Sequence, residues 1–124
     1  MKTFDLSDVQ LFESLLELNF EENYIDLHND YDFKSHKLTQ AKTFTLTFLN
    51  IKTGKELLVC FENTDFIEFF IIGEDNSSVD NFHRARHEKD GKLFDEIENK
   101  KCYYIEFTGE SKIELLSSKL YIVV

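Results

Sequence analysis

The sequence predicts an α+β fold, in which an N-terminal helix packs on a curved, mainly antiparallel sheet of about six or seven strands, as in a roll or an open barrel. Three observations favour this fold. Residues 8–19 repeat apolar side chains at helical spacing, most of the remaining chain repeats them at every second position, and the two patterns do not alternate as in βαβ units. With 124 residues, we expect a single domain spanning 1–124.

The helix is expected over residues 8–19. Ser7 is followed three residues later by Gln10, which matches a capping box. Asp8 would lie in the first turn, where a carboxylate complements the positive end of the helix dipole. Five apolar residues then recur at helical spacing: Leu11, Phe12, Leu15, Leu16 and Leu18.

Strands are expected from residue 24 onward. The clearest is 43–48, where three apolar residues alternate with threonines, and Gly54 lies in a loop that should return the chain as an antiparallel hairpin over 55–62. Apolar residues on both faces of 57–61 and 66–72 predict central strands. Further strands are expected at 24–28, 102–108, 113–116 and 119–124, the last of them paired inside the sheet.

Two segments give weaker signals. Residues 73–81 are polar and predict a loop. Residues 82–101 are mixed and highly charged, with a weak helical pattern in Leu93, Phe94 and Ile97. The 13 phenylalanines and 5 tyrosines of the chain predict a core rich in phenylalanine.

The charge is unevenly distributed. The net charge is −10, and residues 1–33 hold nine acids against one base, Lys2. Such a field repels nucleic acid and anionic lipid and attracts a basic partner, and a solubilising role is the alternative. No secretory signal and no apolar run of about 20 residues is found, so we expect a cytoplasmic protein outside the membrane.

Cofactors and metals are not expected. The four glycines stand singly and form no nucleotide-binding loop, and Cys60 and Cys102 each lie in an apolar run, which predicts two reduced, packed thiols. Metal ligands could be drawn from His83 and His87, or from His28, Asp30, Asp32 and His36. Neither group has the spacing of a known metal motif, so no metal site is assigned.

Arg84 and Arg86 form the candidate anion site, because guanidinium groups bind carboxylate and phosphate with two hydrogen bonds. The alternative is that both arginines pair with surface acids and hold a loop in place. Glu68 and Glu106 each interrupt an apolar strand and are the carboxylates to consider for acid–base chemistry, against the alternative of simple solvent exposure. No nucleophile motif is found, so no catalytic residue is assigned.

We therefore expect a non-enzymatic protein-binding domain, for example an inhibitor or immunity-type protein for a basic partner. The alternative is a small-ligand-binding domain, or a simple hydrolase or isomerase, with a pocket in the curved sheet. A homo-oligomer is compatible with either function. The expected contact residues combine acids with tyrosines, which are common at binding hot spots: Glu13, Glu17, Glu21, Glu22, Tyr24, Asp26, Asp30, Tyr31 and Asp32.

Overall fold

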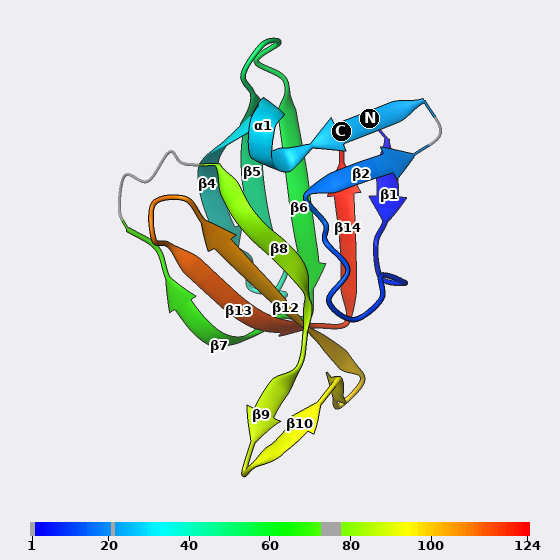
Figure 1. Cartoon of the computed structure of the whole chain (residues 1–124), viewed down its shortest axis with the longest axis vertical. Helices are drawn as coiled ribbons and strands as arrows, with labels where there is room; N and C mark the ends of the chain where they lie inside the picture. Colours follow the sequence, from blue (N-terminus) through cyan, green and yellow to red (C-terminus); the bar gives the residue numbers. More distant parts are fainter. Residues whose placement is uncertain (1, 21, 73–77) are drawn as a thin grey trace.

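The structure is a computed structural model that describes residues 2–20, 22–72 and 78–124 (Figure 1). These residues form fourteen strands and one short helix, α1 (Leu27–Asp30). The predicted α+β fold class is therefore wrong, because no N-terminal helix lies on a sheet. The chain instead forms two antiparallel five-stranded sheets, accompanied by two small hairpins.

The first sheet has its C-terminal strand in an inner position. Its strand order is β1 (Thr3–Asp5), β14 (Lys119–Val123), β6 (Glu56–Glu62), β5 (Phe44–Asn50) and β4 (Tyr31–Leu38). β14 pairs with β1 on one side and β6 on the other, which confirms that the C-terminus is paired inside a sheet. The predicted hairpin between β5 and β6 is also confirmed, with Gly54 at a φ of 71° in its loop.

The second sheet contains β11 (Glu96–Ile97), β12 (Lys100–Phe107), β13 (Lys112–Ser117) and β7 (Asp65–Phe70), in that order. β8 (Val79–Ala85) also pairs with β12, on the edge that faces away from β13. β6 is a central strand as expected. The same prediction is wrong for residues 66–72, because β7 pairs with β13 alone among the described strands and ends the sheet.

Short corners carry the chain between the two sheets. β6 leads into β7 through residues 63–64, and β13 leads into β14 through Ser118. The corners are tied together, because the Ser117 hydroxyl and the Ser118 backbone N–H both donate to the Glu62 carbonyl, at 2.7 and 3.1 Å. As Figure 1 shows, β12 and β13 consequently run across β5, β6 and β14 and not along them.

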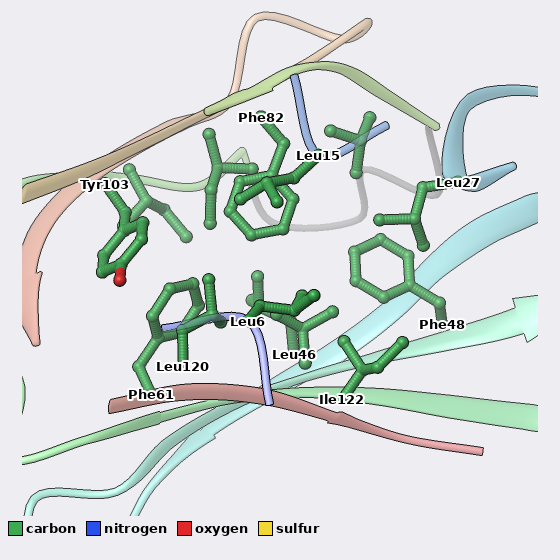
Figure 2. Close-up of a cluster of buried hydrophobic side chains, with 14 of the residues drawn as sticks. Leu6, Leu15, Leu27, Leu46, Phe48, Phe61, Phe82, Tyr103, Leu120 and Ile122 are labelled. Carbon is green, nitrogen blue, oxygen red and sulfur yellow. The ribbon is translucent and has the colours of Figure 1, made fainter. Parts of the chain in front are cut away.

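The core fills the space between the two sheets (Figure 2). Phe61 of β6 is completely buried, with its ring centroid 5.6 Å from that of Tyr103 in β12 and 6.1 Å from that of Phe82 in β8. Phe33 and Phe107 make a similar contact between the sheets, at 4.7 Å. These contacts confirm the phenylalanine-rich core, and they lock the facing sheets in one relative position.

Residues 8–16 are irregular and residues 17–19 belong to a strand, so the predicted helix over 8–19 is wrong, because long-range hydrogen bonds replace the local ones. The Ser7 hydroxyl, expected as a helix cap, accepts from the Leu120 N–H at 3.1 Å. The N–H groups of Phe12 and Leu15 donate to carbonyl oxygens of β8, at 2.8 and 2.7 Å. Phe12 itself has a φ of 62°, which no α-helix allows. The segment covers the free edge of β8 in this way.

Two hairpins complete the fold. β2 (Glu17–Phe20) pairs with β3 (Asn23–Asp26), and β9 (His87–Lys89) pairs with β10 (Lys92–Phe94). The weak helical pattern within 82–101 is therefore misleading. A two-residue turn, Asp90-Gly91, joins β9 and β10 with φ values of 53° and 77°, and this dipeptide is a strong hairpin signal in any sequence.

The other sequence predictions give mixed outcomes. Residues 102–108, 113–116 and 119–124 lie in strands as expected, whereas 24–28 are divided between β3 and α1. Of the expected loop at 73–81, residues 73–77 lie outside the described residues, and the prediction is wrong for 79–81, which begin β8 and pair with β12. Among the residues that are described, no helix is long and apolar enough to span a lipid bilayer.

Candidate functional site

An acidic pocket lies where the N-terminal segment crosses the two sheets. Its volume is about 430 Å³. The apolar lining comes from Leu6, Val9, Leu15, Leu18 and Phe20, and the acidic lining from Asp5, Asp8, Glu13 and Glu17, with Ser14 and Asn19 between them. A cavity of this kind can hold an aliphatic stem against its floor and a cation at its rim.

The pocket is built by residues that anchor an otherwise irregular segment. Leu6, Leu15 and Leu18 are buried in the core, whereas all four acids of the lining are exposed. Phe20, which lines the pocket, stacks on Phe4 with ring centroids 4.4 Å apart. Because the apolar side chains turn inward at these points, the intervening carboxylates must face solvent.

The acids of the pocket form no ion pair with the bases that the structure describes. Every ion pair among the described residues uses a carboxylate from residues 56–114. Asp5 accepts hydrogen bonds from Ser7, which lower the pKa of its carboxyl with help from Lys119 and Lys101. Glu13 accepts from the Gln10 N–H at 3.0 Å. The pocket therefore has a negative field that an external cation can complement.

The β2–β3 hairpin extends this acidic surface. Glu17 stands opposite Asp26 across the hairpin, so two carboxylates share one cross-strand position. Tyr24 is 55% exposed beside them. Desolvation of its hydroxyl and the carboxylates of Glu17, Asp26 and Asp30 raise the pKa of Tyr24. Glu17 thus belongs both to the pocket and to the tyrosine-centred surface beside it.

Asp26 has a structural role within this surface. It is buried and caps α1, accepting from the backbone N–H of Asn29 at 3.0 Å and from its side-chain amide at 2.9 Å. These hydrogen bonds lower the pKa of Asp26. Its carboxylate still adds negative charge near Tyr24, but its side chain is committed to the helix cap.

The structure brings together some of the predicted contact residues and separates others. Glu13 and Glu17 line the pocket, and Tyr24, Asp26 and Asp30 lie around the neighbouring hairpin. The exposed Glu22 is in the turn of that hairpin, whereas Glu21 lies outside the described residues.

Tyr31 and Asp32 are placed apart from the pocket. Tyr31 packs on the core, and Asp32 lines a separate cavity of about 390 Å³ beside Leu49 and Ile51. Sequence reasoning did not select Asp5 and Asp8 as contacts, because Asp8 was assigned to the start of a helix. Their only signal was the excess of acids in residues 1–33.

The two arginines of the candidate anion site both have carboxylate neighbours. Arg84 is largely buried, donates from Nη1 to the Val9 carbonyl at 3.3 Å, and lies 3.7 Å from Glu96 through Nη2. Arg86 donates from Nε to Asp95 at 2.8 Å, and its guanidinium lies 5.8 Å from the Phe12 ring centre. This arrangement agrees with the alternative that the arginines hold local structure.

The remaining candidates are dispersed. Glu68 lies 3.2 Å from Lys112, and Glu106 accepts from the Tyr104 hydroxyl at 2.7 Å, so each carboxylate already has a partner on the outer face of the second sheet. Cys60 and Cys102 are free and buried, which confirms the packed thiols. In the part of the chain that the structure describes, no three acids, histidines or cysteines are grouped as metal ligands would be.

Comparisons of the chain with protein-family models, with curated proteins and with solved structures found no match. Function must therefore be inferred from the geometry and charge of the surface. The acidic pocket is the strongest candidate, because it combines a cavity, an apolar floor and several carboxylates that lack basic partners within the described residues.

Proposed function

We propose that the protein is a non-enzymatic protein-binding domain that binds a basic partner through the acidic pocket and the adjoining β2–β3 hairpin. An inhibitor or immunity-type protein is one example of this class. The observation that carries the proposal is the contrast in charge pairing: the carboxylates of residues 56–114 supply every ion pair in the described chain, and those of the pocket supply none.

Lysine and arginine side chains of a partner suit this pocket. Their aliphatic stems can contact Leu15 and Leu18 while the charged group meets the carboxylates of Asp8 and Glu17. Tyr24 adds an exposed aromatic side chain at the edge, of the kind that is enriched at binding hot spots. Exposed carboxylates mainly accelerate association and select the partner, so binding should weaken strongly as salt is raised.

The test is to immobilise the protein, apply an extract of its native cell at low salt, and identify what elutes as the salt concentration rises. The pocket variant is Asp8→Lys with Glu17→Lys. Glu13 is left unchanged, because its carboxylate accepts a local backbone hydrogen bond. The matched control is Asp80→Lys with Glu88→Lys, which changes the net charge equally at two exposed positions of β8 and β9.

We expect a basic protein to be retained at a stoichiometric level by the wild type and the control, and to be lost by the pocket variant. Equal loss from both variants would mean that overall charge alone attracts the protein. Retention of the same protein by the pocket variant would place the binding site elsewhere, and retention of no basic protein would contradict the proposal for the partners present in that extract.

A further inference from the structure

An apolar groove of about 510 Å³ opens between β4 and β7, the edge strands that end the two sheets. This volume is within the range of about 300–1,000 Å³ that is usual for small-molecule sites. The groove shares no residue with the acidic pocket, and no acid is among its lining residues, which are His36, Lys37, Leu38, Phe44, Phe66 and Phe69.

The groove exists because the core is not covered at this side. His36 and Leu38 of β4, and Phe66 and Phe69 of β7, stand opposite buried residues of β5 and β13, so they share the inward faces of their sheets. No described strand joins β4 to β7. Leu38 and Phe69 are consequently 51% and 42% exposed, although they face the core side.

The walls of the groove are aromatic rings that already contact one another edge to face. Phe66 lies 4.9 Å from Phe44 and 5.1 Å from Phe69, and the His36 ring lies 5.2 Å from Phe69, all measured between ring centroids. Phe44 is almost completely buried and forms the floor. Because these rings already contact one another edge to face, a flexible alkyl chain fits the remaining space better than another flat ring.

The charged residues at the groove indicate which head group the alkyl chain of a ligand would carry. His36 and Lys37 are the titratable residues of the lining, and both are bases. Lys37 alternates with His36 and Leu38 and stands opposite Thr45, so its side chain leaves from the outer face of β4 and adds positive charge at the open edge of that strand. It forms no ion pair with any described residue. The neighbouring acids are already engaged, because Asp65 binds Lys42 and Lys100, and Glu68 binds Lys112. In a chain of net charge −10, this local balance favours an anionic head group.

We infer that the groove binds an amphiphile that has an unbranched alkyl chain and one carboxylate. The chain lies against Phe44, Phe66 and Phe69, and the carboxylate lies beside His36 at the open edge of β4, where the neighbouring Lys37 adds positive charge. This inference does not depend on the proposed binding of a basic protein, because the two sites differ in residues and in charge.

The test is calorimetric titration of the full chain with hexanoate, octanoate and decanoate, each kept below its micelle concentration. Burial of a methylene is worth about 0.8 kcal/mol, so two buried methylenes tighten binding about fifteenfold. In a groove that is partly open, we expect about threefold or more for each step of the series. Decan-1-ol and decyltrimethylammonium, which lack the carboxylate, should bind at least about tenfold more weakly than decanoate.

Two groove variants and one control make the test specific. Leu38→Glu places a like charge at an exposed rim position and should abolish decanoate binding without disturbing the fold. Lys37→Met should weaken the binding of decanoate and leave that of decan-1-ol unchanged, because it removes a positive charge from the open edge of β4. Leu93→Ser is the control, since Leu93 is an exposed apolar residue of β10 that lies outside the groove lining, and it should bind decanoate as the wild type does.

The inference is overturned if decanoate does not bind at millimolar concentration, if decyltrimethylammonium binds equally well, or if Leu38→Glu has no more effect than Leu93→Ser. It is also overturned if sedimentation shows a stable dimer that Leu38→Glu dissociates and decanoate leaves intact, because the groove would then be covered by a second copy of the chain.

Discussion

The two sheets and the N-terminal segment of residues 6–20 are stabilised by different kinds of contact. In the sheets, long antiparallel ladders coincide with facing rows of buried aromatic and aliphatic side chains. The N-terminal segment is held by separate hydrogen bonds to β8 and β14 and by a few buried leucines. The region that carries the acidic pocket is therefore held mainly by separate tertiary contacts, and the sheets by continuous ladders.

This difference predicts unequal responses to loss of a buried side chain. Phe61→Ala should have the largest effect, because Phe61 is completely buried and its ring contacts span both sheets. We expect a loss of about 3–5 kcal/mol in the free energy of unfolding, measured in urea. The control is Ile51→Ala, since Ile51 is 59% exposed in the β5–β6 loop and should change stability by about 0.5 kcal/mol or less. Similar losses in both variants would contradict the core described above.

Leu15→Ala should have the next largest effect, about 2–3 kcal/mol, because Leu15 is 2% exposed. Its consequences should also be more local. In hydrogen exchange, the N–H groups of Phe12 and Leu15, which bind β8, should lose protection more than the N–H groups of β5 and β6. A uniform loss of protection would show that the segment and the sheets unfold as one unit.

Asp26→Ala tests how much the helix cap stabilises α1, which connects the β2–β3 hairpin to the first sheet. Loss of the α1 cap should cost about 1 kcal/mol at neutral pH. The pKa of Asp26 is lowered in the folded protein from its ordinary value near 3.8, so its contribution is present above that pH and is lost as the pH falls below it. The difference from wild type, followed by thermal unfolding, should therefore shrink in acid. A difference that is constant from neutral pH to below 3 would contradict a role for the ionised carboxylate.

The same contrast explains which parts of the fold could be predicted from sequence. Strands with strict alternation, such as 43–48, were predicted correctly because burial on one face sets both the pattern and the register. Residues 8–19 have a genuine amphipathic pattern, but Leu15 is buried from an irregular backbone whose N–H groups bind the free edge of β8, and Leu18 is buried from strand β2. Local periodicity cannot reveal that such an edge will be available.

The sequence indicated that the N-terminal region has an acidic surface, but it did not indicate which acids line the pocket. The excess of acids in residues 1–33 was visible, and Glu13 and Glu17 were selected from it. Asp32 was selected with them although β4 carries it to a different cavity. The apolar groove was hidden for a related reason. Residues 66–72 are apolar on both faces, as in a central strand, but β7 is an edge, and only strand order distinguishes the two.

The smallest predicted effect is a difference in stability between two substitutions of Phe12, and its sign distinguishes the observed N-terminal segment from a helix. Phe12 has a φ of 62°, in the left-handed region where a Cβ costs roughly 1 kcal/mol. Phe12→Gly should therefore be more stable than Phe12→Ala by up to about 1 kcal/mol, since both variants lose the same contacts with Arg86 and His83. At an exposed position inside a helix the order would be reversed, with alanine better than glycine by about the same amount. Urea unfolding of the two variants, with the matched pair Ser14→Gly and Ser14→Ala as reference, measures this sign. If alanine proves the better residue at position 12, a helical segment would have to replace the irregular one, and the acidic pocket would be reshaped with it.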